Sequence, residues 1–61
     1  MKLVIEMSLD NAAFNDWPGE EAGRVVGAAI DKLSFYGDED EETDIFDLNG
    51  NRVGTAKVVV A

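Results

Sequence analysis

Residues 45–53, with the sequence IFDLNGNRV, contain a strong hairpin signal. The dipeptide Asn49-Gly50 is typical of a two-residue type I′ turn, because that turn needs positive φ at both central positions. Apolar, β-branched and aromatic residues on both sides are typical of strands. The pattern predicts a β-hairpin over about residues 44–60. A two-residue turn would place Asp47 opposite Arg52, and this charge pair would help to set the register.

An amphipathic helix is predicted upstream of the hairpin, over about residues 18–35. Pro18 suits the first turn, and Asn15 or Asp16 is placed to cap it. Gly37 follows the predicted helix where a left-handed C-terminal cap belongs. The apolar side chains recur at helical spacing and form one stripe, which consists of Ala22, Val25, Val26, Ala29, Ile30 and Leu33.

A first strand is predicted over about residues 2–8, where apolar and polar residues alternate with period two. The element order is therefore β-α-β-β, and the predicted fold class is α+β. We expect one small domain, residues 1–61, with one helix packed on a three-stranded antiparallel sheet of order 1-3-2. The last strand is placed in the centre because its valine-rich end is the most apolar segment. The sheet face away from the helix would be open, and Val4, Ala56 and Val58 are candidates to lie on it.

Composition excludes several classes of protein. The chain has 61 residues, enough for one domain, with no cysteine or histidine and a net charge of −8. The absence of both residue types removes thiolate nucleophiles, the usual general base and the commonest metal ligands, so we predict no enzyme activity, cofactor or metal. The negative charge disfavours direct binding to nucleic acid or anionic membrane. No signal peptide or membrane span is recognisable, which predicts a soluble cytoplasmic protein.

The most unusual feature is an acidic loop predicted over residues 38–44. Positions 38–47 hold seven carboxylates and no cation. Three interpretations stay open: a solvated loop that aids solubility, a surface that binds a basic partner, and a divalent-cation site. The spacing of Asp38, Asp40 and Glu42 resembles early calcium-loop ligands, but Thr43 stands where the loop requires glycine, so that motif fails.

The binding interpretation is specific enough to name residues. Alternate side chains on one face of a strand lie ~6.6–6.8 Å apart, so a row of carboxylates can imitate a row of phosphates. The candidates are Asp38, Glu39, Asp40, Glu41, Glu42, Asp44 and Asp47. A second patch at the helix start would hold Asp16, Glu20 and Glu21, although helix N-termini favour glutamate in any case. Trp17 is the aromatic candidate for an interface anchor, whereas Phe14, Phe35 and Tyr36 are expected at the edge of the core.

Three segments together resemble small proteins encoded by bacteriophages and prophages: DNAAF at residues 10–14, the acidic helix start after Pro18-Gly19, and DLNGNRVG at residues 47–54. The chain departs from that pattern in its helix glycines and in the acidic stretch 38–42. Phage-encoded proteins of this size and charge include anti-CRISPR proteins, several of which act as DNA mimics.

The resemblance implies a non-catalytic inhibitor in the bacterial host cytoplasm. Its partner would be the basic nucleic-acid-binding surface of a defence complex, such as a CRISPR surveillance complex. The alternative is a small structural or assembly protein of a phage. Such a protein would act through protein contacts of the open sheet face, as a monomer or homodimer.

Overall fold

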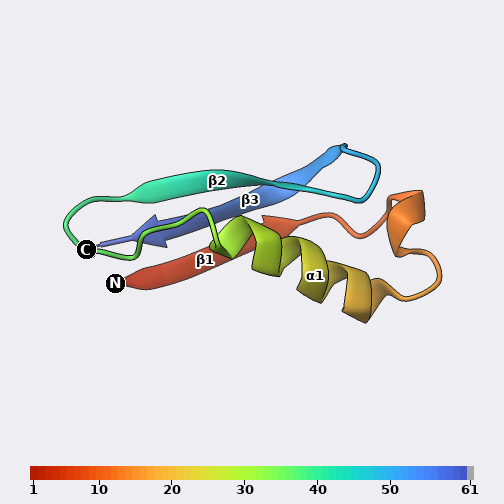
Figure 1. The fold of residues 1–61 in the computed structure, drawn as a ribbon, viewed down its shortest axis with the longest axis horizontal. Helices are drawn as coiled ribbons and strands as arrows, with labels where there is room; N and C mark the ends of the chain where they lie inside the picture. The colour runs from red at the N-terminus through yellow and green to blue at the C-terminus, as the bar shows by residue number, and fades with distance from the viewer. Residues whose placement is uncertain (61) are drawn as a thin grey trace.

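The computed structural model describes residues 1–60 and has one helix packed on a three-stranded antiparallel sheet (Figure 1). The elements in chain order are β1 (Lys2–Met7), the short 3-10 helix η1 (Ala12–Phe14), α1 (Pro18–Ile30), β2 (Glu41–Phe46) and β3 (Arg52–Val59). The strand order is β1-β3-β2, and both outer strands run antiparallel to β3. The predicted α+β fold, element order and strand order are confirmed.

The strand register separates the two faces of the sheet. Ala56 in the central strand pairs with Ile5 on one side and Thr43 on the other, and it is fully buried beneath the helix. Val58, two residues further along, is also fully buried on this face. Of the three apolar residues predicted on the open face, Val4 alone lies there. Ala56 and Val58 lie opposite Ile5 and Leu3 on the helix side, whereas Val4 lies opposite Lys57 on the other face, so the three residues cannot share one face of the sheet.

The helix is shorter at its C-terminal end than predicted. It ends at Ile30, and the next backbone N–H groups make three-residue turns to Ala29 and Ile30. Phe35 has a φ of 57°, which is incompatible with a helix, and Gly37, with a φ of 81°, lies in the connection rather than at the helix cap. The apolar stripe continues beyond Ile30 in sequence, but the backbone N–H groups of Ser34 and Phe35 donate to the side chain of Glu41 and not to a helical carbonyl.

The helix begins at the predicted proline without the predicted cap. Trp17 occupies the N-cap position and its side chain makes no capping hydrogen bond. Asn15 instead ends η1, where its backbone N–H donates to Ala12. Pro18 has no N–H, so the first turn has one unpaired backbone donor fewer than other helix starts.

The hairpin turn is one residue longer than predicted. The backbone N–H of Gly50 donates to the carbonyl of Asp47, and only Gly50 has positive φ, at 81°. This geometry is a three-residue loop closed by a glycine bulge, not a type I′ turn. Phe46 therefore lies opposite Arg52, and the register shifts between Ile45 and Phe46. The expected Asp47–Arg52 pair is not formed because the loop moves these residues out of register.

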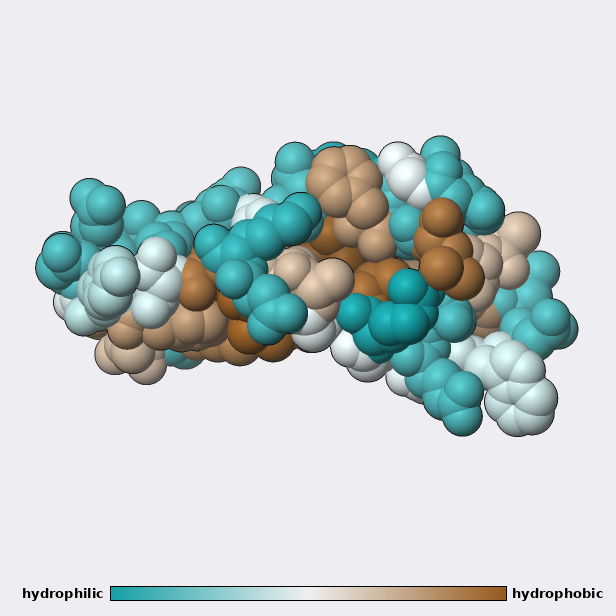
Figure 2. All heavy atoms as spheres, in the orientation of Figure 1, coloured by the Kyte–Doolittle hydropathy of each residue, from teal (hydrophilic) through white to brown (hydrophobic). Residues whose placement is uncertain are grey.

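The core is small and lies between α1, β2 and β3. Its buried apolar residues are Phe14, Val25, Ala29, Ile45, Ala56 and Val58. The helix packs mainly on β2 and β3, so the part of the sheet that β1 forms is poorly covered. Leu3 and Ile5 face the helix side but keep 40% and 38% of their surface exposed. Figure 2 shows hydrophobic atoms along the lower border of the molecule, where β1 runs in Figure 1.

Candidate anionic surface

The acidic residues are divided between a loop and a strand. The predicted acidic loop, residues 38–44, ends at Asp40, and β2 begins at Glu41. Glu41 and Glu42 pair with Val58 and Lys57 of β3. These two acidic residues therefore belong to the sheet and not to a loop. We call residues 38–42 the acidic end. It lies near the C-terminal end of β3, at one tip of the elongated molecule (Figure 1).

Two carboxylates hold the acidic end in place. One oxygen of Glu41 accepts the backbone N–H of Ser34 at 2.9 Å, and the other accepts the N–H of Phe35 at 3.0 Å. Asp40 accepts the backbone N–H of Val60 at 2.9 Å. These contacts join the acidic end to the segment after the helix and to the end of the central strand. Glu41 and Asp40 were predicted to bind a partner. In the structure their carboxylates already accept hydrogen bonds from the backbone.

Three carboxylates of the acidic end point into solvent. Asp38, Glu39 and Glu42 are exposed, and within residues 1–60 none of them takes part in an ion pair. Glu42 lies opposite Lys57 in the sheet register, on the face away from the helix. Asp38 and Glu39 have no basic residue beside them in sequence. These three side chains form the free part of the predicted anionic surface.

The other two predicted acidic candidates in the hairpin have local partners. Asp44 is exposed and pairs with the guanidinium of Arg52, with 2.9 Å between Oδ1 and Nε. Asp47 is 6% exposed, and its Oδ1 accepts the backbone N–H groups of Asn49 and Asn51, each at 2.9 Å. A buried carboxylate that accepts two backbone hydrogen bonds shapes the turn. Asp47 is therefore withdrawn from the solvent-facing set.

The second predicted patch lies at the other end of the molecule. Asp16, Trp17 and Glu20 are exposed at the start of α1, and Glu21 pairs with Arg24 one turn along the helix. In Figure 1 the helix start and the acidic end lie at opposite ends of the long axis, which extends 38 Å. The fold does not bring the two patches together. Trp17 is 68% exposed, as an anchor residue would be, but it belongs to the distant patch.

One aromatic side chain beside the acidic end is far more exposed than predicted. Tyr36 was expected at the edge of the core, but it is 84% exposed. It lies two residues before Asp38, between the positive-φ residues Phe35 and Gly37. This backbone path turns Phe35 towards the protein and leaves Tyr36 outside. The proximity of Tyr36-Gly37 to the acidic run was the only available signal.

The open sheet face is balanced in charge. It displays alternate residues of each strand, so the acidic side chains are interspersed with basic ones. The charged residues of this face are Lys2, Glu6, Glu42, Asp44, Arg52 and Lys57. Three of the five basic residues of the chain are thus placed here. The excess negative charge is consequently displaced to the ends of the molecule rather than spread over the sheet.

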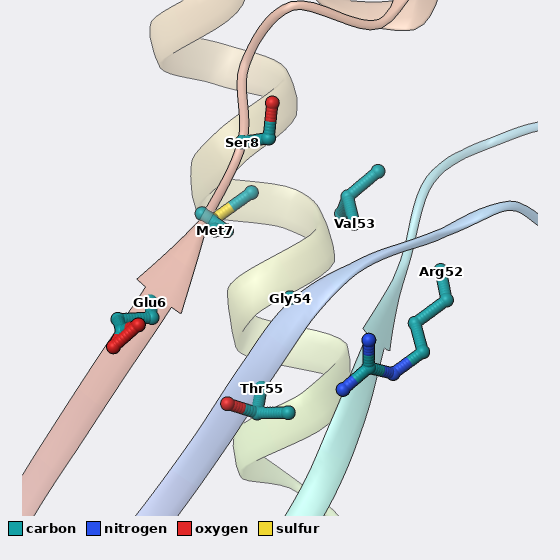
Figure 3. A pocket seen from close by; sticks show the side chains of 7 residues that line it. All are labelled: Glu6, Met7, Ser8, Arg52, Val53, Gly54 and Thr55. Atoms are coloured by element: carbon teal, nitrogen blue, oxygen red, sulfur yellow. The ribbon is translucent and has the colours of Figure 1, made fainter.

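A shallow depression of about 380 Å³ lies on this face at the junction of β1 and β3 (Figure 3). Its polar lining consists of Glu6, Ser8, Arg52 and Thr55. The depression thus holds one carboxylate, two hydroxyls and one guanidinium. None of the predicted partner-binding residues lines the depression.

Residues 1–60 hold no candidate metal site and no candidate membrane-spanning helix. No three metal-ligating side chains converge in this part of the chain. Helix α1 has 13 residues, and no helix in this part of the chain is both long and apolar enough to cross a membrane.

No family model, no curated protein and no solved structure matches the chain. The resemblance to phage-encoded proteins therefore stays a prediction.

Proposed function

We propose that the protein is a non-catalytic inhibitor whose acidic end occupies a basic nucleic-acid-binding surface on a bacterial defence complex. The observation that supports this proposal is the arrangement of the acidic end. Asp38, Glu39 and Glu42 project into solvent from a segment whose neighbours, Asp40 and Glu41, are tied to the backbone. A fixed array of charges loses less conformational freedom on binding than a mobile tail does.

The overall charge density also supports the proposal. Eight net negative charges along a 38 Å axis correspond to one charge per about 4.8 Å. A nucleic acid single strand carries one charge per ~3.4 Å, and a duplex carries one per ~1.7 Å. On this average the protein is closer to a single strand than to a duplex, although its charge is gathered at the two ends of the axis. We expect it to compete most effectively where its partner holds an unpaired strand.

The composition of the flanking surface suits a protein partner. Tyr36 is an exposed aromatic side chain beside the carboxylates, and tyrosine is enriched among residues that contribute most to protein interfaces. The acidic end attracts a cationic groove over a distance, which makes association fast and sensitive to salt. Tyr36 then supplies apolar contact once the groove is reached.

The experiment is a competition between the protein and labelled nucleic acid for purified CRISPR surveillance complexes, read by fluorescence anisotropy. The protein is added in excess to complexes already assembled with guide RNA, with single-stranded and with duplex targets. We expect displacement of the nucleic acid, with the stronger effect on single strands and a loss of effect as salt is raised. Unchanged nucleic-acid binding across the panel would contradict the proposal.

A matched pair of triple variants locates the active surface. The test variant carries Asp38→Asn, Glu39→Gln and Glu42→Gln, and the control carries Asp10→Asn, Asp16→Asn and Glu20→Gln. Both reduce the net charge from −8 to −5, and all six side chains are exposed. We expect the test variant to lose at least about tenfold in inhibition, and the control less than threefold. Equal losses would assign the effect to net charge alone.

The assembly alternative is not favoured by the open face. The two apolar residues expected to provide contacts on that face, Ala56 and Val58, are buried on the opposite side of the sheet. What the face presents instead is a balanced mixture of charges around Val4. A specific contact between copies of the chain has a better location at the edge of the sheet.

A further inference from the structure

The outer edge of β1 has unpaired backbone groups. Within residues 1–60 no strand lies beyond β1, which is an edge of the sheet. The N–H of Ser8 donates to the carbonyl of Val53 in β3 at 2.9 Å. Since backbone direction alternates along a strand, Lys2, Val4 and Glu6 also turn their backbone groups to β3. Leu3 and Ile5 therefore direct theirs outward.

This edge carries little of the protection that edge strands usually have. Natural edges are shielded by prolines, bulges, central charges or a covering element. Strand β1 is KLVIEM, with no proline, a regular register to β3 and its two charges flanking an apolar centre. All three central side chains are exposed: Leu3 and Ile5 on the helix side, and Val4 on the open face.

The sequence of β1 is complementary to itself in the antiparallel direction. A two-fold axis at Val4 pairs Lys2 of each copy with Glu6 of the other. The same axis pairs Leu3 with Ile5 twice and places the two Val4 side chains against each other. Opposite charges meet at both ends and apolar groups meet in the middle, which is the self-complementarity that an isologous interface requires.

The backbone geometry agrees with the same register. Leu3 and Ile5 turn their N–H and carbonyl groups outward, so they form the hydrogen-bonded pairs of the new ladder. Lys2, Val4 and Glu6 then fall at non-hydrogen-bonded positions, where opposing side chains are closest. A shift of the axis to Leu3 or Ile5 would break both Lys2–Glu6 pairs.

We propose that the protein forms a homodimer by antiparallel pairing of β1 with β1 of a second copy, centred on Val4. The two sheets become one six-stranded sheet, and Leu3 and Ile5 gain apolar neighbours. The opposite edge cannot serve in this way. Strand β2 carries Glu41, Glu42 and Asp44 and no basic residue, so its self-pairing would gather six carboxylates.

The dimer has a salt dependence opposite to that of the proposed inhibition. Each copy carries a net charge of −8, so the two copies repel at long range. Added salt screens that repulsion, whereas it weakens binding of the acidic end to a basic partner. A six-residue edge is a small interface, and we expect a weak dimer that populates at high protein concentration. The two proposals can thus fail independently.

The decisive experiment uses sedimentation velocity on the full chain and on two charge-reversal variants, Lys2→Glu and Glu6→Lys. Each variant alone places like charges opposite each other twice, and we expect about tenfold weaker self-association. Their equimolar mixture restores both opposite-charge pairs in a heterodimer. The mixed dimer has the same total charge as the wild-type dimer, so recovery of wild-type association reports the register rather than net charge.

A third variant tests the centre of the interface. Val4→Lys places two cations on the axis. Within the monomer the new cation also lies opposite Lys57, so far-UV circular dichroism and urea unfolding check that the variant stays folded. We expect it to be monomeric at all concentrations. The proposal is overturned by a wild-type chain that stays monomeric at millimolar concentration and high salt. It is also overturned by a Val4→Lys dimer, or by a variant mixture that associates no better than its components.

Discussion

Replacement of Glu41 by alanine is expected to destabilise the protein far more than the same change at its neighbour Glu42. The two residues are adjacent, have the same charge and belong to the same strand. Glu41 is half-buried and accepts the backbone N–H groups of Ser34 and Phe35. Glu42 is exposed and makes no hydrogen bond to the backbone of residues 1–60.

The expected magnitude follows from these two contacts. Hydrogen bonds to a charged group contribute about 1.5–3 kcal/mol each, and partial exposure argues for the lower end of that range. The loss of two is therefore about 3 kcal/mol, of which about 1 kcal/mol is regained as side-chain freedom. The net change is about 2 kcal/mol, which is ~8–16 °C in Tm for a domain of this size. The whole domain has only about 3–9 kcal/mol of stability.

The assay is urea unfolding followed by circular dichroism, on wild type, Glu41→Ala, Glu41→Gln and Glu42→Ala. We expect Glu42→Ala within about 0.5 kcal/mol of wild type, and Glu41→Gln between the two alanine variants, since an amide keeps one acceptor oxygen. The slope of the free energy of unfolding against urea should stay constant. Equal stability of the two alanine variants would refute the anchoring role of Glu41.

Three further predictions concern stability and use the same unfolding measurement. Asp47→Ala should lower the free energy of unfolding by about 2 kcal/mol because two backbone hydrogen bonds of the turn are lost. Asp44→Ala removes only an exposed ion pair and should lower it by under about 1 kcal/mol. Similar losses in the two variants would contradict this prediction. Gly54→Ala should cost about 3 kcal/mol or prevent folding, because the new Cβ would lie 2.0 Å from a backbone oxygen of β1. Gly23→Ala and Gly27→Ala face open space on α1 and should each stabilise the protein by about 0.5–1 kcal/mol; a destabilised variant would indicate an unrecognised contact.

The sequence predicted the elements of the fold better than their ends. The period-two pattern of β1 and the helical stripe from Ala22 to Ile30 depend on local spacing, which is visible along the chain. The end of α1 depends on Glu41, whose carboxylate draws the backbone of Ser34 and Phe35 away from the helix. A contact between residues six or seven positions apart, across a turn, leaves no periodic signal.

The same limit explains the hairpin. Asn49-Gly50 signalled a turn correctly, but the turn type was decided by Asp47, whose side chain accepts two N–H groups and widens the loop by one residue. The longer loop places Arg52 opposite Phe46 instead of Asp47, and the guanidinium pairs with Asp44. Beyond the register shift, Thr43 pairs with Ala56 as a two-residue turn would also have placed them. The sequence shows that the carboxylates cluster. Only the hydrogen bonds in the structure show which of them bind the backbone and which are free.

The hairpin tip offers a point of attachment for studying the rest of the molecule. Leu48 is 61% exposed, and the turn around it is held by its own hydrogen bonds. It lies at the end of the long axis opposite residues 38–42 (Figure 1). A dye or surface linker coupled through a cysteine introduced there, in a chain that has no other thiol, would leave the distant carboxylates unobstructed. The molecule can thus be immobilised in a single orientation, with residues 38–42 accessible to a partner in solution.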